Sequence, residues 1–481
     1  MVKSYIKRLF EKNKIDIPES KMTKFEEFVA DTELEKLVNV IKESQDEIMD
    51  KWQLQNRIDD IKAQNIPIPN GTVGKKYHKI LDFNVLNLTD LARIAVMGLE
   101  GIGLEFDEEG KVIKGIPTKS GNLKLQFFFN LKGEEEIKNF HEKEITIIIN
   151  PDPKSLWKDI ASDETDKFWK PDNITTSDSL GDRHIVVASK RGRSHANVGS
   201  FRDDDFAFKH FEDTGWSVVA VSDGAGSYPF SRKGSELACK GVIEYFDSSE
   251  SIDFLFKLNE DLKVFNKSKD ENLITEIKTA AIKNMYKATV DVYNKLNDFA
   301  KTTLEEYPDE FNISKIKNAL GYFHATLIFS LFKKYDFGYV FLSFGVGDCP
   351  IAVIHNEQKS VTLMNILDVG EFGGGTRFIT QTDIFQSSEK MSKRFSFNVF
   401  TDFSHLFLMS DGIYDPKFEV EANLEKIEKW QEFLKDLNGE NEDNNQVILS
   451  HENENIEEQL SKWMNFWSSG NHDDRTLAVV F

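Results

Sequence analysis

The pattern of apolar and polar positions changes twice along the chain, and each change predicts a different kind of structure. In residues 1–64, apolar residues recur every three to four positions and charged residues fill the positions between them, which predicts amphipathic helices. In residues 65–150, a turn-rich stretch at Ile66–Gly71 precedes strand-like segments such as Leu123–Phe129 and Glu144–Ile149. We therefore expect a helical N-terminal region followed by a small β-sandwich.

The remainder of the chain begins with residues 151–180, whose Pro, Asp and Trp residues predict an irregular linker. From residue 181 onward, short apolar runs predict strands at Ile185–Ser189, Trp216–Val221, Thr326–Phe332, Tyr339–Phe344, Ile351–Ile354, Leu406–Met409 and Leu477–Phe481. Helical periodicity intervenes at Gly234–Tyr245, Ile274–Phe299 and Glu421–Leu437. Grouped strands with segregated helices indicate an α+β domain over residues 181–481.

Aspartates stand at the ends of several of these predicted strands. They are Asp203 and Asp204 in an Arg-Asp-Asp-Asp run, Asp223 in Ser-Asp-Gly-Ala-Gly, Asp348 in Gly-Asp-Cys, Asp411 and Asp415 in Ser-Asp-Gly-Ile-Tyr-Asp, and Asp473 in His-Asp-Asp-Arg-Thr. One Asp-Gly pair is typical of a turn, but several such aspartates in one domain predict carboxylates converging on a hard cation. Oxygen ligands favour Mg²⁺ or Mn²⁺ over zinc. Metal-assisted phosphate chemistry is therefore the leading hypothesis.

Composition and charge narrow the classes of protein to which the chain can belong. The 481 residues carry a net charge of −21, which disfavours binding to nucleic-acid backbones or anionic membranes. The two cysteines, Cys239 and Cys349, lack zinc-site spacing, and Cys349 is expected to be a small buried residue without a partner base. The N-terminus lacks the apolar core of a signal peptide, and no apolar run reaches the ~20 residues of a membrane span, so we expect a cytoplasmic protein.

The order of the aspartate motifs over residues 181–481 resembles that of the PPM-type, metal-dependent (type 2C) serine/threonine protein phosphatases, in particular their bacterial subfamily. The resemblance implies a four-layer α/β-β/α sandwich, in which helices flank two antiparallel sheets and the metals lie at one end. It also implies hydrolysis of phosphomonoesters on protein Ser or Thr, by a bridging water that two Mn²⁺ or Mg²⁺ ions activate.

Site residues follow from the same resemblance. Asp223 matches the bridging carboxylate, and Gly224 would offer its backbone carbonyl. Asp411 and Asp473 match the other core ligands. Asp473 is adjacent to Asp474, and the motif favours Asp473 as the ligand and Asp474 as the residue that caps a turn.

Four further aspartates complete the implied site. Asp203 and Asp204 stand where the family has Glu-Asp, holding metal or metal-bound water, and Asp204 is also a catalytic candidate. Asp348 and Asp415 match acidic positions associated with a third, looser ion, although Gly-Asp before Cys349 is also compatible with an ordinary hairpin.

The sequence departs from the family pattern at several points. Asp203 has a shorter reach than the commoner Glu, and Ala225 occupies the position at which eukaryotic members place a His proposed as the acid. His195 is a candidate acid by its place in the sequence, with a surface histidine as the simpler interpretation. For the phosphate-binding arginine, Arg193 is preferred and Arg202 is the rival.

Two further regions have no predicted catalytic residues. Residues 65–150 resemble bacterial Ig-like sandwich modules, and Gly373–Arg377 suggests a flap near the site. Phosphorylated proteins are the expected substrates, including a cognate Ser/Thr kinase or its targets, and the acidic surface would steer towards basic sequences. The alternative is a pseudo-phosphatase that binds phosphoproteins as a scaffold, for which Ala225 and Asp203 are the supporting features.

Overall fold

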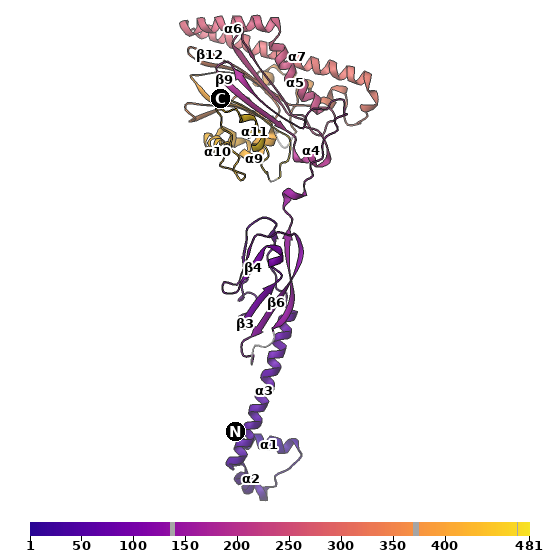
Figure 1. The fold of residues 1–481 in the computed structure, drawn as a ribbon, viewed down its shortest axis with the longest axis vertical. Coiled ribbons are helices and arrows are strands. Elements are labelled where there is room, and N and C mark those ends of the chain that lie inside the picture. The colour runs from indigo at the N-terminus through magenta and orange to yellow at the C-terminus, as the bar shows by residue number, and fades with distance from the viewer. Residues whose placement is uncertain (135–139, 369–374, 469) are drawn as a thin grey trace. The chain divides into compact units, whose positions relative to one another are not determined.

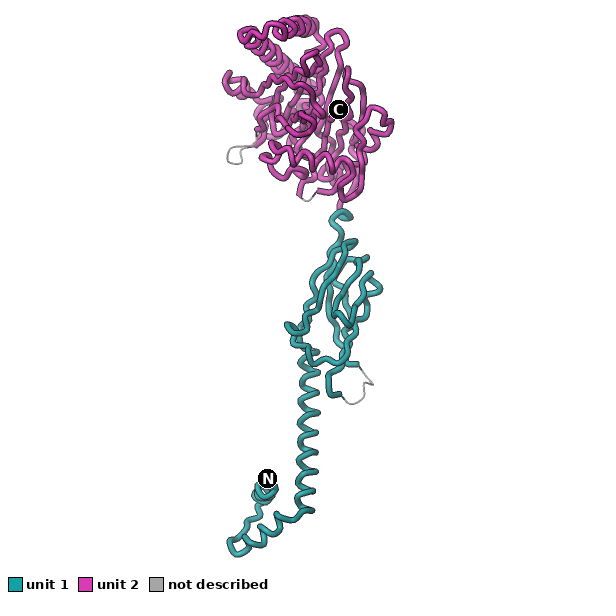
Figure 2. The backbone as a smooth tube through the Cα atoms, turned by 90° about the vertical axis from the view of Figure 1, so that its left-hand side faces the viewer, with its two compact units in different colours: residues 1–156 teal, residues 157–481 magenta. Residues whose placement is uncertain are grey.

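The structure is a computed structural model that describes residues 1–134, 140–368, 375–468 and 470–481 (Figure 1). The chain forms two compact units, Met1–Leu156 and Trp157–Phe481 (Figure 2). Within the described ranges, no helix combines the length and the apolar character that crossing a bilayer requires.

The first unit begins with helices. They are α1 (Val2–Lys12), α2 (Met22–Val29) and the 32-residue α3 (Thr32–Ala63), which Asp31 caps by accepting from the Glu33 amide. Ile6, Phe25 and Val38 form a small core where the three helices meet. At its other end α3 buries Ile58 and Ile61 in the core of the β-structure that follows.

Two sheets enclose that second core. One has the order β1 (Gly71–Thr72), β7 (His141–Asn150), β6 (Gly121–Leu131) and β3 (Leu91–Met97). The other has the order β2 (Tyr77–Ile80), β5 (Val112–Gly115) and β4 (Leu104–Asp107). Alternate residues of β7, Ile145, Ile147 and Ile149, point into the core, as the period of a strand requires. This unit therefore consists of a helical segment followed by two sheets around one core.

The second unit contains two antiparallel sheets. The five-stranded sheet has the order β10 (Asp205–Phe211), β11 (Trp216–Ser222), β12 (Leu327–Tyr335), β13 (Gly338–Val346) and β16 (Phe395–Phe400). The six-stranded sheet has the order β15 (Ser360–Leu363), β14 (Ile351–His355), β17 (Phe403–Met409), β18 (Arg475–Val480), β9 (Arg183–Lys190) and β8 (Asn173–Leu180). Side chains from both sheets, such as Val219 and Val187, share one buried core.

Helices pack on the outer faces of these sheets (Figure 1). Helices α5 (Ser231–Phe246), α6 (Ser249–Ser268) and α7 (Glu271–Glu306) bury their apolar faces against the five-stranded sheet. Helices α9 (Asp411–Phe418), α10 (Ile427–Leu437) and α11 (Ile456–Trp463) do the same on the six-stranded sheet. Short helices α4 (Arg193–Val198) and α8 (Ser388–Ser392) lie in connecting segments. The outcome is a mixed α+β fold.

Several segments differ from the sequence-based expectation: strands β10, β15 and β16 and helices α9 and α11 were not predicted, and the helix predicted over Glu421–Leu437 begins only at Ile427. The predicted linker, residues 151–180, ends earlier, because β8 occupies Asn173–Leu180 and pairs with β9 along its whole length. Its sequence, Asn-Ile-Thr-Thr-Ser-Asp-Ser-Leu, is polar because β8 is an edge strand with only Leu180 fully buried. Helix α6 had not been predicted at all.

Candidate metal centre

Strand pairing brings the aspartates of distant segments to one end of each sheet. The start of β10 pairs with the end of β11, with Asp205 opposite Ser222, so Asp204 and Asp223 leave the sheet side by side. In the other sheet Met409, at the end of β17, pairs with Leu477 near the start of β18. Residues 411 and 473 therefore leave that sheet at the same end.

The carboxylates that follow these strand ends form one electrostatic cluster. Burial raises the pKa of Asp223 well above its ordinary value, and the charges of Asp204, Asp411, Asp473 and Asp348 raise it further, in that order. Without a cation, such a group of carboxylates resists joint ionisation. The structure thus brings together residues from five separate segments that the sequence had predicted to converge.

The pKa values of the other carboxylates in the cluster are raised in the same way. Burial, and then the charge of Asp474, raise the pKa of Asp203 and of Asp204 to about 7. Burial raises the pKa of Asp411 well above its ordinary value, with added repulsion from Asp473 and Asp348. Asp473 and Asp415 are the exposed members among the predicted ligands, so the cluster opens to solvent on their side.

Three oxygens in this cluster lack hydrogen-bond partners within the described chain, although each is buried. They are Oδ1 of Asp204, Oδ1 of Asp348 and Oδ1 of Asp411. The second oxygen of Asp204 accepts from the Thr476 hydroxyl at 2.8 Å, which orients the carboxylate. A buried polar atom without a partner is costly, and a cation would remove that cost. The donor set, all oxygen, fits Mg²⁺ or Mn²⁺.

Asp474, next to the predicted ligand Asp473, has a different role. Its Oδ1 accepts from the backbone N–H of Gly192 and its Oδ2 from that of Asp203, while the Nδ1 of His195 lies 3.1 Å from Oδ1. Both oxygens are therefore already used. Asp474 ties the segment before β18 to the segment before β10, which supports the choice of Asp473 over Asp474 as the ligand.

His195 is not the surface histidine that the sequence suggested. Its side chain is 15% exposed, and its Nε2 lies 3.9 Å from Oδ2 of Asp203. Burial lowers its pKa, but the hydrogen bond and charge of Asp474 outweigh burial and raise the pKa to about 10, with help from Asp203 and Asp473. In the sequence, only the position of His195 shortly before the acidic run had marked it as a candidate.

Asp348 and Asp415 lie at a second edge of the cluster. Oδ2 of Asp348 accepts from the Thr376 hydroxyl at 2.6 Å, and Oδ2 of Asp415 accepts from the Asn471 amide at 3.3 Å. Asp223, Asp348 and Cys349 each place one potential ligand atom within 4.8 Å of the others. Burial raises the pKa of the Cys349 thiol well above its ordinary value, which agrees with a buried, inert cysteine.

Thr376 belongs to the segment predicted as a flap, Gly373–Arg377. Residues 373 and 374 of that segment lie outside the described residues. The hydrogen bond to Asp348 shows that residue 376 reaches the carboxylate cluster.

Two glycines allow the motifs to approach one another closely. A Cβ on Gly224 would lie 2.5 Å from the carbonyl oxygen of Asp203, and a Cβ on Gly412 would lie 1.9 Å from that of Asp474. Each of these glycines therefore allows two aspartate-bearing segments to pack closely. The backbone of Gly224 also forms an isolated bridge with Ala325.

Neither candidate arginine contacts a cluster carboxylate side chain among the hydrogen bonds of the described chain. Arg193 donates to the carbonyls of Phe466 and Asn465, and its guanidinium lies 5.0 Å from the Trp467 ring centroid. Arg202 is buried and donates to backbone carbonyls, including that of Asp204. The phosphate-binding role of Arg193 stays a prediction, and the contacts of Arg202 are structural.

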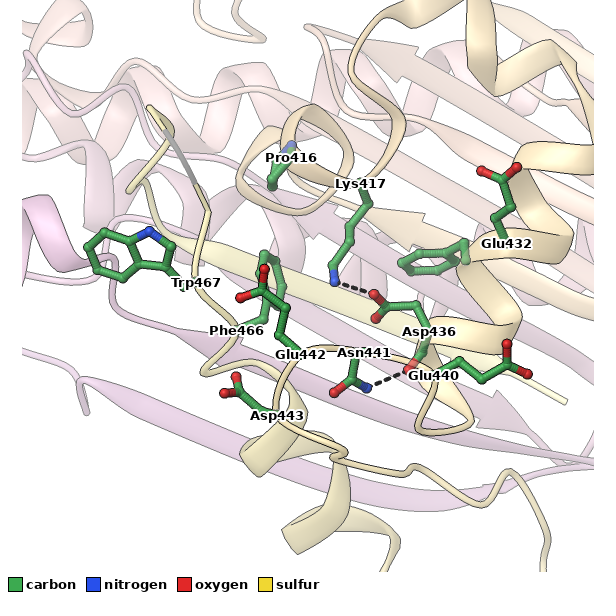
Figure 3. Close-up of a pocket in the computed structure, with 11 residues that line it drawn as sticks. Pro416, Lys417, Glu432, Asp436, Glu440, Asn441, Glu442, Asp443, Phe466 and Trp467 are labelled. Carbon is green, nitrogen blue, oxygen red and sulfur yellow. Dashed lines mark hydrogen bonds and ion pairs between the residues drawn. The ribbon is translucent and has the colours of Figure 1, made fainter. Parts of the chain in front are cut away.

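A separate hollow of about 380 Å³ lies beside α9 and α10 (Figure 3). Lys417 binds the Asp436 carboxylate there at 2.7 Å, and the Asn441 amide donates to the Asp436 carbonyl at 2.7 Å. None of the predicted site residues lines this hollow. Its polar groups hold α9 and α10 together and take no evident part in the carboxylate cluster.

The fold and the carboxylate cluster agree with comparison against known families. A model of the protein phosphatase 2C family matches residues 191–465, more than half of the chain. The chain belongs to the protein phosphatase 2C family. It is a metal-dependent phosphoprotein phosphatase, a hydrolase, and its cofactor is Mg²⁺ or Mn²⁺. No curated protein matches the chain.

Several solved structures resemble part of the chain. A bacterial serine phosphatase is 14% identical, with a TM-score of 0.34, over 62% of this chain and 96% of that one. The phosphatase Stp1 from Staphylococcus aureus is 13% identical, with a TM-score of 0.34, over 62% and 93%. The catalytic domain of the phosphatase PstP, solved with two manganese ions, is 13% identical, with a TM-score of 0.33, over 64% and 98%.

Proposed function

We propose that the second unit hydrolyses phosphoserine and phosphothreonine monoesters in proteins with two divalent cations held by Asp204, Asp223, Asp411 and Asp473. The observation that carries the proposal is the set of buried carboxylate oxygens without partners, together with the raised pKa values of the cluster. Asp203, the backbone carbonyl of Gly224, and Asp348 with Asp415 are proposed as further ligands. The two sheets with helices on their outer faces support a four-layer sandwich.

When bound, the cations would supply Lewis-acid activation of water and charge neutralisation of the phosphoryl group. The protein's own residues hold the ligand carboxylates in position. Thr476 and Thr376 fix the orientation of the Asp204 and Asp348 carboxylates through hydrogen bonds. Asp474 fixes the backbone of Asp203 and holds His195 beside it. This preorganisation leaves the ligand oxygens little freedom to lose when the cations bind.

Exposure of Asp473 and Asp415 places the opening of the cluster on the side of these two residues. A phosphorylated side chain can reach the carboxylates from there, whereas the buried apolar core between the sheets excludes solvent from the other side. The leaving Ser or Thr oxygen needs a proton donor, and Ala225 has no titratable group to serve as one. His195 carries a proton next to Asp203, but its Nδ1 is held by Asp474.

The test is hydrolysis of p-nitrophenyl phosphate by the full chain with Mn²⁺, with Mg²⁺ and with EDTA. We expect turnover that requires metal and that falls at least a hundredfold in Asp223→Asn, because the shared carboxylate is lost. Asp336→Asn, in the exposed turn between β12 and β13, is the matched control and should keep full activity. Metal-independent turnover, or an active Asp223→Asn variant, would overturn the proposal.

The pseudo-phosphatase alternative makes a different prediction in the same experiment. It requires binding of Mn²⁺ and of phosphopeptide without release of phosphate. Retention of every core carboxylate argues against it, because a buried acidic cluster is costly in a module that only binds.

A further inference from the structure

A groove of about 840 Å³ lies in the second unit, near the loops that carry Asp223 and Asp348. Three segments line it: the C-terminal half of α7 from Tyr293 to Leu304, residues 315–321, and residues 377–383. Tyr228 and His324 close it on the side of the metal centre.

Covalent and hydrogen-bonded links place this groove next to the proposed metal ligands. Tyr228 belongs to the loop that follows Asp223 and Gly224, and the Ala225 amide of that loop donates to the His324 carbonyl at 3.0 Å. Arg377 directly follows Thr376, whose hydroxyl binds Asp348. A chain whose phosphorylated residue enters the cluster therefore meets this groove within a few residues.

The charge of the groove is opposite to that of the whole protein. Lys301, Lys315, Lys317 and Arg377 line it, and Asp383 is the single acidic residue among its lining residues. Lys315 and Lys317 are exposed, and neither has an ion pair within the described parts of the chain.

The other two cations are only loosely held in place. Lys301 reaches Asp298 at 3.3 Å, a pair with both side chains more than 60% exposed, and such pairs contribute little. Arg377 binds Asp383, which leaves part of its guanidinium for another acceptor.

The wall nearest the metal centre is aromatic and uncharged. The His324 ring lies 4.6 Å from the Tyr228 ring and 4.9 Å from the Phe378 ring, and its Nδ1 is 2.6 Å from the Thr380 hydroxyl. Burial lowers the pKa of His324 to about 4, so it is neutral at physiological pH. The groove therefore offers a flat wall for peptide packing at one end and cations at its outer rim.

We propose that this groove binds an anionic segment of the substrate protein that flanks the phosphorylated residue. The proposal rests on the proposed phosphatase function and names its substrate class. Lys315 and Lys317 are the principal specificity residues, because they are the cations of the groove without a competing carboxylate. Carboxylates of Asp or Glu and a second phosphate group share the required chemistry.

The experiment uses the full chain with Mn²⁺ and four phosphoserine peptides of equal length. Their flanks carry Glu, Gln, Lys or a second phosphoserine. We expect kcat/KM for the Glu peptide to exceed that for the Gln peptide about tenfold at low salt, since a few exposed ion pairs give an effect of that order. The kcat/KM for the Lys peptide should be lower than that for the Gln peptide, and 0.5 M NaCl should reduce the differences in kcat/KM among all four peptides.

Substitutions test whether Lys315 and Lys317 cause the preference for the Glu peptide. In Lys315→Ala with Lys317→Ala, the ratio of the Glu peptide to the Gln peptide should fall towards one. Lys267→Ala, an exposed lysine of α6 outside the groove, is the matched control and should keep the ratio. A ratio near one in the unchanged protein, or a ratio unaffected by the double substitution, would overturn the proposal.

Binding of the same labelled peptides, followed by fluorescence anisotropy, gives a second readout without turnover. Absence of any phosphate release would be a failure of the proposed function, whereas equal binding of the Glu and Gln peptides would be a failure of this inference. The doubly phosphorylated peptide distinguishes the two sources of negative charge: a clear advantage over the Glu peptide assigns the groove to a second phosphate.

Discussion

Removal of metal should make the stability of this protein fall as pH rises from about 5 to 7. Burial and mutual repulsion hold the pKa of Asp203 and of Asp204 at about 7 in the metal-free fold, and those of Asp223 and Asp411 are also well raised. In the unfolded chain these groups titrate near 3.9. Between the two values the folded chain holds more protons than the unfolded chain, so the free energy of unfolding decreases with pH.

The magnitude follows from the number of protons involved. Each extra proton held by the folded chain makes the free energy of unfolding fall by about 1.4 kcal/mol per pH unit. One group with a folded pKa of about 7 therefore costs about 2 kcal/mol between pH 5 and pH 7, and the cluster contains more than one such group. Bound Mn²⁺ would offset the repulsion, so the slope should flatten when metal is present.

The assay is urea unfolding, followed by tryptophan fluorescence, at pH 5, 6, 7 and 8 with EDTA or with Mn²⁺. Asp223→Asn removes one carboxylate without changing the size of the side chain. It should be more stable than the unchanged protein in EDTA at pH 7 and gain less from Mn²⁺. The reasoning would be refuted if stability in EDTA rose between pH 5 and 7, or if Asp223→Asn lowered stability in EDTA.

Two further substitutions test how the aspartate segments are held together. In Gly412→Ala the new Cβ would lie 1.9 Å from the Asp474 carbonyl, so both stability and Mn²⁺-dependent turnover should fall; Gly101→Ala, where nothing lies within 4 Å of a Cβ, should change neither. Asp474→Ala leaves the Gly192 and Asp203 amides without acceptors and should lower the free energy of unfolding by about 3 kcal/mol, more than Asp474→Asn, as urea midpoints would show. An Asn variant as damaging as the Ala variant would contradict this assignment.

The convergence of the aspartates could be predicted because it depends on local signals. Asp223 and Asp411 each come after a run, Val218–Val221 or Leu406–Met409, that is apolar throughout, which is typical of a strand buried on both faces. Asp223 and Asp411 follow such strands directly after a single Ser. Antiparallel pairing then places them with the residues before β10 and β18.

Other parts of the site could not be predicted, because their partners are distant in the sequence. Asp474 and Gly192 are separated by 282 positions, and only the pairing of β18 with β9 brings them together. The position of His195 depends on the same pairing. Strand β8 was missed for a different reason: an edge strand facing solvent does not need the apolar pattern by which buried strands are recognised.

If the groove binds as proposed, the net charge of the chain does not determine the charge of its substrates. The value of −21 predicts attraction of basic sequences over long distances, where the protein acts as a single charge. Close to the protein, screening limits each charge to about 8–10 Å, so the residues that line a groove decide what binds there. Lys301, Lys315 and Arg377 come from separate segments, and each segment by itself is an ordinary mixture of charges. Acidic surroundings also repel an acidic substrate everywhere else, so a locally basic groove would confine productive binding of such a substrate to the neighbourhood of the metal centre.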